Sequence, residues 1–206
     1  MLSEKGFDRW SGDYDQSIAL HAEGYPFEGY YDVLSYVQHR INVNDGVKIL
    51  DLGVGTGLLT QELYKQGAQI VGVDFSQAML DLAQQKMPKA RFYHFDFQAG
   101  LPGQLQEETF DYIVSSYAFH HIDDDEKMEF ISKLQRVRGD QCPLIIADVA
   151  FATKTELDQC RAKAGRRWDA DEFYIVGDEI SQQLTAMQFT VKYTQISPCA
   201  GVLEIH

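Results

Sequence analysis

The sequence predicts a single α/β domain built on a doubly wound, mostly parallel sheet of seven strands. Three observations support this prediction. Apolar strand-like segments alternate with amphipathic helical segments from residue 47 onward. A glycine-rich turn, Gly53-Val54-Gly55-Thr56-Gly57, separates the first of these strands from a helix. The 206 residues suffice for one sizeable domain and not for two.

In the first half of the chain, each predicted element follows from side-chain periodicity and from residues that start or stop helices. The predicted helices cover residues 3–19, 27–42, 57–66 and 76–87, and the predicted strands cover residues 47–52, 69–74 and 91–95. Ser76 is expected to cap the helix that follows it, and Pro88 to end that helix. Strand, helix and strand in succession favour parallel pairing.

The second half continues this pattern and ends differently. Strands are predicted over 112–115 and 143–148, a helix from Asp123 or Asp124 to about Val137, a polar segment over 152–176 and a helix near 178–187. The last two strands, 189–195 and 201–205, are separated only by a short turn. They are therefore expected to form an antiparallel hairpin at the edge of the sheet.

Composition narrows the class of partner. Lys and Arg number 18 and Asp and Glu 31, a net charge of −13 that argues against nucleic acid as a partner. The three cysteines form no metal-ligand cluster, and a reduced setting fits them best. Neither a signal peptide nor a membrane-spanning run is evident. We therefore expect a cytoplasmic protein that has no nucleic-acid or membrane partner. We also expect it to act on a small molecule and to be a monomer or a homodimer.

Two predicted strands end in residues that suit a nucleoside. Glycines at the turn after the strand 47–52 allow a ligand to approach bare backbone, and the next helix offers unpaired N–H groups. Asp74 ends the strand 69–74, and a carboxylate there can accept hydrogen bonds from both ribose hydroxyls. Together they predict a site for a nucleoside-containing cofactor.

The order of these parts resembles the class I S-adenosylmethionine-dependent methyltransferases over residues 45–206. The matching parts are the glycine turn, Asp74 with Phe75-Ser76, and the strand Phe110-Asp111-Tyr112-Ile113-Val114 followed by His120-His121. The chain is most similar to small bacterial members of the ubiquinone/menaquinone-biosynthesis-like branch (methyltransferase types 11 and 25). The resemblance implies a Rossmann-like methyltransferase domain over 1–206, with a helical lid (1–44), a cofactor-binding core (45–150) and a substrate-side part (151–206).

The resemblance also implies S-adenosyl-L-methionine as cofactor and assigns roles to individual residues. Asp74 would hold the ribose hydroxyls, and Asp96 would accept from the adenine amino group. The remaining cofactor-binding candidates are Asp51, Gly53, Gly55 and Gly57 along the methionine and ribose, Phe75, Met79 and Phe97 around the adenine, Ser115 at the end of its strand, and Tyr14 for the cofactor's carboxylate.

His120 and His121 are the catalytic candidates, because they lie beside the expected methyl group and one of them could act as a base. They could also only orient the loop before Asp123. No metal site is expected from these three residues, since residues so close in sequence rarely converge on one ion. Ser115-Ser116-Tyr117-Ala118 stands where methyltransferases of nucleic-acid and protein amines often carry Asn-Pro-Pro-Tyr, which argues against base or amide nitrogen as the acceptor.

Two other functions are compatible with part of this pattern. A protein could bind S-adenosylmethionine and transfer nothing if its substrate pocket were closed. An NAD-dependent dehydrogenase would carry the fingerprint G-x-G-x-x-G, whereas here Gly57 arrives one residue early and Leu58 takes its place. A dehydrogenase would also give Asp96 no role.

Overall fold

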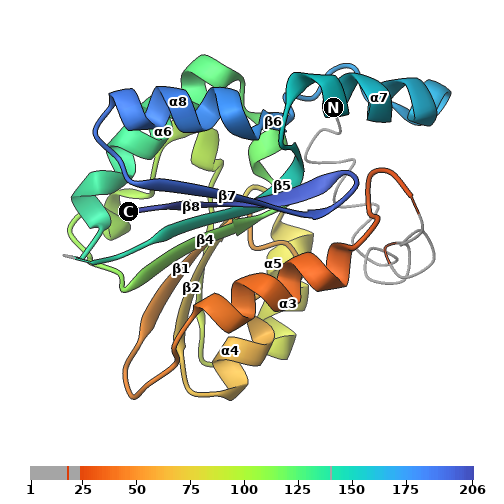
Figure 1. The fold of residues 1–206 in the computed structure, drawn as a ribbon. Coiled ribbons are helices and arrows are strands. Elements are labelled where there is room, and N and C mark those ends of the chain that lie inside the picture. Colours follow the sequence, from red (N-terminus) through yellow and green to blue (C-terminus); the bar gives the residue numbers. More distant parts are fainter. Residues whose placement is uncertain (1–17, 19–23, 140) are drawn as a thin grey trace.

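The computed structural model describes Ile18, residues 24–139 and residues 141–206. A twisted sheet with the strand order β3-β2-β1-β4-β5-β8-β7 forms its centre (Figure 1). The strands are β1 (Lys48–Leu52), β2 (Gln69–Asp74), β3 (Arg91–His94), β4 (Tyr112–Ser116), β5 (Leu144–Phe151), β7 (Val191–Ser197) and β8 (Ala200–Ile205). The first five pair in parallel, while β8 runs antiparallel to both β5 and β7. The predicted doubly wound sheet with its terminal hairpin is confirmed.

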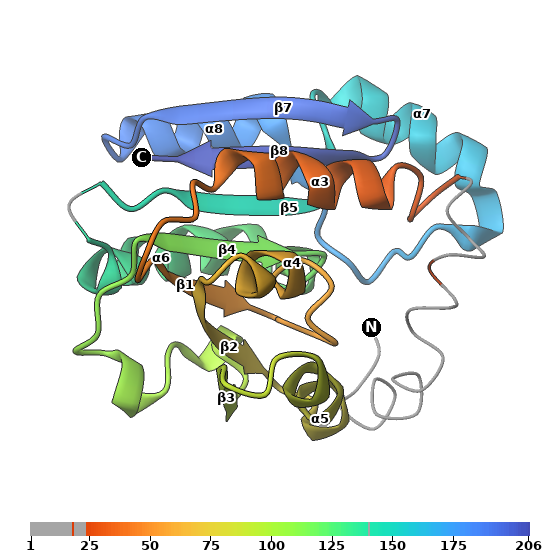
Figure 2. The ribbon, with the colours of Figure 1, turned by 90° about the horizontal axis from the view of Figure 1, so that it is seen from below.

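Helices cover both faces of this sheet (Figures 1 and 2). On one face lie α3 (Tyr30–Arg40), α4 (Gln61–Lys65) and α5 (Gln77–Lys86), and on the other α6 (Asp124–Leu134) and α8 (Gly177–Ala186). Each strand contributes side chains to the core on both faces of the sheet, because successive side chains point to opposite faces. Ile49 joins the core beneath α3 and α4, whereas Leu50 joins the core beneath α6 and α8.

Two of the predicted helix starts are confirmed by their caps. The Ser76 hydroxyl accepts a hydrogen bond from the Met79 N–H at the start of α5, which ends at Lys86, just before Pro88. Asp123, rather than Asp124, caps α6 by accepting from the Glu126 N–H at 2.8 Å. A side-chain acceptor at this position satisfies an N–H group that has no partner inside the helix.

The segment predicted as polar, 152–176, contains a helix whose bounds the periodicity did not reveal. This helix, α7 (Lys154–Ala164), begins with a capping box in which Thr153 and Glu156 bond each other's backbone N–H groups. Only two of its residues are buried, so no apolar stripe marks it in the sequence. A two-residue strand, β6 (Ile175–Val176), then pairs in parallel with the end of β5.

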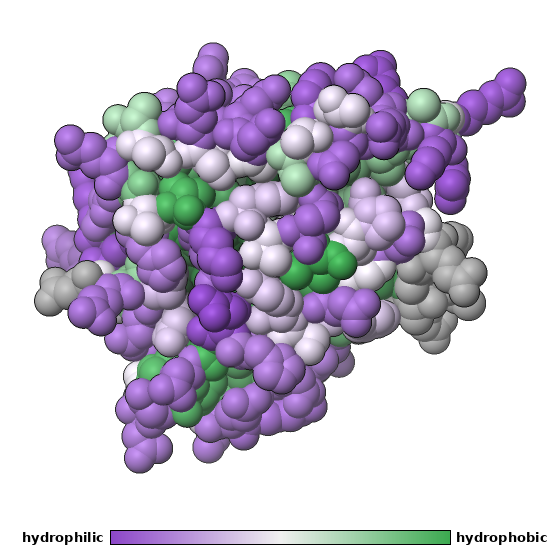
Figure 3. All heavy atoms as spheres, in the orientation of Figure 1, coloured by the Kyte–Doolittle hydropathy of each residue, from purple (hydrophilic) through white to green (hydrophobic). Residues whose placement is uncertain are grey.

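The predicted helix over 27–42 is observed as α3, and it packs across β5, β7 and β8. It is thus part of the layer that covers the sheet. The helix predicted over 3–19 lies outside the described residues except for Ile18, and so does half of the proposed lid. No described helix is long and apolar enough to cross a membrane. The molecular face in Figure 3 is largely hydrophilic, with hydrophobic side chains in small separate patches.

Candidate active site

The carboxyl ends of β1, β2 and β4 meet at one edge of the sheet, and their loops enclose a cavity there. It is lined by Gly53, Gly55, Asp74, Phe75, Met79, Asp96, Phe97, Gln98, Ser116, Tyr117, Ala118 and His121. Ligands of open α/β sheets bind outside the carboxyl ends of the strands, where the strand order reverses. Here that point lies between β1 and β4. Eight of the predicted site residues therefore share one cavity: Gly53, Gly55, Asp74, Phe75, Met79, Asp96, Phe97 and His121.

Asp74 is the charged centre of this cavity. Its Oδ2 accepts from the Gly55 N–H at 2.8 Å, and its Oδ1 accepts from the Ser76 N–H at 2.9 Å. Burial raises the pKa of this carboxyl to about 6, although both N–H groups oppose the shift. Each carboxylate oxygen can accept more than one hydrogen bond, so both can still receive a ribose hydroxyl. The glycine turn and the end of β2 thus hold a carboxylate already oriented for a diol.

Asp51 is fully buried on β1 and is only partly satisfied. The Thr60 hydroxyl donates to Oδ2 at 2.8 Å, while Oδ1 has no hydrogen-bond partner within the part of the chain that is described. Burial raises the pKa of the Asp51 carboxyl to about 7. A buried acceptor without a donor is costly, and a polar group of a bound cofactor would relieve that cost. Asp51 itself does not line the cavity, so its predicted contact with the cofactor remains a prediction.

The three glycines of the turn do different work. All three have positive φ, and a Cβ on Gly53 would come within 2.5 Å of the Ala118 Cβ. A Cβ on Gly55 would meet nothing within 4 Å, so Gly55 faces open space. Gly57 was predicted to bind cofactor, but it does not line the cavity. A Cβ there would meet the Met87 Cε at 2.6 Å, so Gly57 allows the turn to pack against α5 instead.

The adenine side matches the prediction in position. Asp96 is exposed and caps a short 3₁₀ turn by accepting from the Gln98 N–H at 3.0 Å. Phe97 is buried, stacks on Phe119 and lies near Gly53. Asp96 and Phe97 therefore border the same cavity, and their contact with adenine stays a prediction.

Ser115 does not line the cavity, and its predicted contact with the cofactor stays a prediction. It is fully buried, and its hydroxyl donates to the Leu52 carbonyl at 2.7 Å, so it ties β4 to β1. Its neighbour Ser116 lines the cavity, because adjacent strand residues point to opposite faces. Tyr117 follows with φ of 51°, an uncommon value for a residue that is not glycine, and its ring stacks on Tyr30. Tyr14 lies outside the described residues.

His120 is held by Asp148, which lies in the second half of β5. The His120 Nδ1 lies 2.5 Å from Asp148 Oδ1, and the His120 backbone N–H donates to Asp148 Oδ2 at 3.1 Å. Burial opposes a charge on the imidazole, but the carboxylates of Asp148 and Glu172 outweigh it and hold the pKa of His120 above its usual value. For His121, burial lowers the pKa to about 3. The two adjacent histidines are thus placed in opposite electrostatic environments.

Glu172 and Tyr174 complete this side of the site; the sequence singled out neither Glu172 nor Asp148, whereas Tyr174 stands in an aromatic-rich segment. The Tyr174 hydroxyl donates to Glu172 Oε2 at 2.7 Å and is also hydrogen-bonded to the Tyr25 hydroxyl. The Tyr25 ring in turn stacks on Trp168 with 5.1 Å between centroids. Asp148 was detectable as a polar residue inside a buried strand. The contacts of Tyr25 with Trp168 and Tyr174 join segments about 150 residues apart, which no local pattern encodes.

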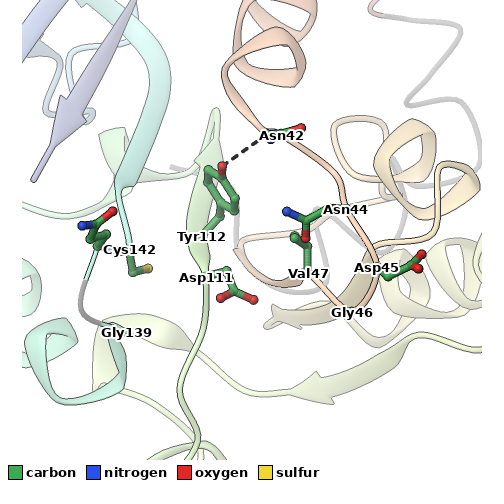
Figure 4. Close-up of a pocket in the computed structure, with 10 residues that line it drawn as sticks. Asn42, Asn44, Asp45, Gly46, Val47, Asp111, Tyr112, Gly139 and Cys142 are labelled. Atoms are coloured by element: carbon green, nitrogen blue, oxygen red, sulfur yellow. Dashed lines mark hydrogen bonds between the residues drawn. The ribbon is translucent and has the colours of Figure 1, made fainter.

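A hollow of about 490 Å³ lies at the opposite edge of the sheet, and it is not the cofactor site (Figure 4). Asn42, Asn44, Asp45, Asp111 and Tyr112 are among its lining residues, and the Asn42 N–H donates to the Tyr112 hydroxyl at 3.2 Å. It therefore adjoins the amino ends of β1 and β4, away from the glycine turn and Asp74. Although this hollow is large, the residues suited to a nucleoside lie at the other edge.

Comparison with known proteins agrees with this geometry. A protein-family model described as "Methyltransferase domain" matches residues 49–139. An uncharacterized methyltransferase of Anoxybacillus flavithermus is 31% identical, over 96% of this chain and 94% of that protein. One from Geobacillus sp. (strain WCH70) is 33% identical over the same shares.

Solved structures share the fold at lower identity. The chain superposes on the DhpI–SAH complex with a TM-score of 0.75 and 16% identity, covering 98% of this chain and 94% of that one. Against magnesium protoporphyrin IX methyltransferase (ChlM) from Synechocystis PCC 6803 with bound SAH, the TM-score is 0.65 and the identity 21%, covering 100% and 88%.

The chain therefore belongs to the class I S-adenosylmethionine-dependent methyltransferases, and the cofactor predicted from the sequence is confirmed. The relatives that span its full length are themselves uncharacterized methyltransferases. The narrower resemblance to the ubiquinone/menaquinone-biosynthesis branch stays a prediction.

The raised pKa of Asp74 predicts a pH dependence of cofactor binding. Ribose hydroxyls donate to the ionised carboxylate, so binding lowers the pKa of Asp74 from about 6 and releases a proton. The affinity for S-adenosylhomocysteine is therefore expected to rise from pH 5 to about pH 6 and to level off above that. Any contact with Asp51 would extend the rise toward pH 7. Calorimetry in two buffers of different ionisation enthalpy measures the released proton. An affinity that stays constant between pH 5 and 7 would contradict the role of both carboxylates.

Proposed function

We propose that this protein transfers the methyl group of S-adenosylmethionine to a small-molecule acceptor by in-line attack. The observation that carries the proposal is Asp74, which the Gly55 and Ser76 N–H groups orient in the lining of a cavity that Asp96 and Phe97 also line. S-adenosylmethionine supplies a methyl group on a positively charged sulfur, which leaves as the neutral thioether when the acceptor's electron pair forms the new bond.

On the cofactor side, the residues of the chain bind the cofactor and orient its methyl group. Asp74 would accept the two ribose hydroxyls, and Asp96 would accept from the adenine amino group beside Phe97. Gly55 leaves room for a ligand because nothing occupies the place of its missing side chain. Positioning of this kind accounts for roughly 7 to 11 kcal/mol of rate enhancement in well-oriented systems.

On the acceptor side, we assign His120 and His121 to the region where the methyl group is transferred. His121 lines the cofactor cavity, and the ring of His120 packs against the ring of His121, with 4.1 Å between their centroids. Tyr25, Trp168 and Tyr174 pack together next to His120 and form an aromatic boundary. Such an enclosed boundary suits a small organic acceptor better than a polymer, and the net charge of −13 points the same way.

The transfer is tested with S-adenosylmethionine carrying an isotopically labelled methyl group. The purified protein is incubated with fractions of small metabolites, and label in the fraction is followed together with release of S-adenosylhomocysteine. We expect transferred label and released S-adenosylhomocysteine in equal amounts. In the Asp74→Ala variant we expect neither. A protein that binds the cofactor tightly but releases no S-adenosylhomocysteine with any fraction would instead be a non-catalytic cofactor-binding protein.

A further inference from the structure

His120 and Glu172 face each other across a gap that a hydrogen bond does not fill. The His120 Nε2 and the Glu172 Oε1 are 3.7 Å apart, beyond the 2.7 to 3.2 Å of an N–H···O bond. Their side chains are largely buried, with 10% and 17% of the surface exposed. At this distance the two side chains could hold a bound ligand between them.

The other polar atom of each side chain is already bonded. The His120 Nδ1 lies 2.5 Å from Asp148 Oδ1, and Glu172 Oε2 accepts from the Tyr174 hydroxyl at 2.7 Å. Metal-binding histidines almost always pair their second nitrogen with a carboxylate or carbonyl, and ligating carboxylates are hydrogen-bonded in turn. The arrangement therefore leaves Nε2 and Oε1 as the two atoms directed into the gap.

His121 supplies a third ligand atom. One ring nitrogen of His121 lies within 4.8 Å of the ligand atoms of both His120 and Glu172. Ligand atoms that share one ion at about 2.1 Å are themselves roughly 3 to 4.3 Å apart. Side-chain adjustments of a few tenths of an ångström would thus bring all three onto one ion.

The backbone around Glu172 is fixed from two sides. The Phe173 N–H donates to the His120 carbonyl at 2.8 Å, and the fully buried Lys127 donates from Nζ to the Phe173 carbonyl at 2.6 Å. These two bonds attach the loop that carries Glu172 to the histidine turn and to α6. A ligand set gathered from two segments needs such anchoring to keep its geometry.

We propose that His120, His121 and Glu172 bind a divalent transition-metal ion of the Zn²⁺ type. Two imidazoles and one carboxylate are ligands that such ions accept, and three protein ligands leave a coordination position open. The two carboxylates nearby, Asp148 and Glu172, supply the negative charge that a dication needs. Asp123, the acidic residue nearest in sequence, is used instead as the cap of α6.

The ion's role rests on the proposed function, whereas its binding does not. Because His121 also lines the cofactor cavity, the ion would lie beside the place of transfer. Its open position would then bind an oxygen atom of the acceptor. This identifies the acceptor class as a small molecule with a hydroxyl or carboxylate oxygen that can coordinate a metal.

The test is a titration of the metal-free protein with Co²⁺ and with Zn²⁺, without cofactor or acceptor. We expect one ion per chain and a visible Co²⁺ absorption band of a nitrogen- and oxygen-ligated site. Glu172→Gln and His121→Asn are expected to weaken binding at least tenfold. His39→Asn, at an exposed histidine, and Asp123→Asn, which keeps an N-cap residue, are expected to bind as the unchanged protein does.

Thermal midpoints of the metal-free variants separate a lost ligand from a lost fold. Unchanged binding in both Glu172→Gln and His121→Asn would overturn the proposal, and so would an equal loss in Asp123→Asn. No binding by the unchanged protein would also overturn it, and would leave His120 and Glu172 as a direct ion pair. Because the titration needs no cofactor, either result leaves the proposed methyl transfer to be judged by its own assay.

Discussion

Asp74→Ala is expected to weaken the binding of S-adenosylhomocysteine about 100- to 10,000-fold. The substitution removes the acceptor of two ribose hydroxyls, and each hydrogen bond to a charged group contributes about 1.5 to 3 kcal/mol. The Gly55 and Ser76 N–H groups lose their acceptor as well, so the turn is no longer held in place. Isothermal titration calorimetry at pH 7.5 measures the affinity.

The matched control is Asp81→Ala. Asp81 is an exposed carboxylate on α5, which begins just after Asp74, and its Oδ1 accepts a hydrogen bond from the Gln77 side chain. The affinity of the Asp81→Ala variant for S-adenosylhomocysteine should equal that of the unchanged protein. If Asp74→Ala kept its affinity while folding normally, the assignment of Asp74 to the ribose would be wrong.

Gly53→Ala is expected to destabilise the fold by about 2 to 4 kcal/mol. The positive φ of 70° costs about 1 to 2 kcal/mol for a residue with a side chain, and the new Cβ would overlap the Ala118 Cβ at 2.5 Å. In a domain of this size, each kcal/mol lowers the thermal midpoint by roughly 2 to 4 °C. A fall of roughly 5 to 15 °C should follow, measured by circular dichroism.

Gly55→Ala separates backbone strain from loss of space for a ligand. Its Cβ would meet no protein atom within 4 Å, so only the strain at φ 52° remains and the midpoint should fall by a few degrees. Cofactor affinity should nevertheless drop, because the methyl group enters the space where a ligand approaches. Gly46→Ala, also at positive φ with open surroundings but away from the cavity, should show the small stability loss alone. Equal cofactor affinity in Gly55→Ala and Gly46→Ala would contradict the proposal that the cofactor lies against Gly55.

Much of the sheet and of the cofactor side could be predicted, because both depend on short-range patterns. Buried parallel strands are continuous apolar runs, and the residues at their ends meet at one edge, so Asp74 and Asp96 could be placed together. Ser115 and Gly57 do not line the cavity, and their contacts with the cofactor stay predictions. The alternation of side chains along β4 places Ser116 at the cavity instead. A glycine needed for packing, as Gly57 is here, looks the same in a sequence as one needed for a ligand.

His120 and His121 could be named from the sequence, but their partners could not, since these contacts join separate segments. Asp148 comes from β5 and Glu172 from the loop after α7, and they meet His120 only through the order of strands in the sheet. The helix α7 was missed because it buries too few residues to show a stripe, although Thr153 and Glu156 have the spacing of a capping box.

The thermal midpoint is to be measured with S-adenosylmethionine, S-adenosylhomocysteine or NAD, each in large excess. A ligand at about 100 times its dissociation constant adds roughly 2.7 kcal/mol, or about 5 to 10 °C for a domain of this size. We expect this rise with both adenosyl compounds and none with NAD. A rise with NAD alone, or no rise with any of the three, would contradict the assignment of the cavity to S-adenosylmethionine.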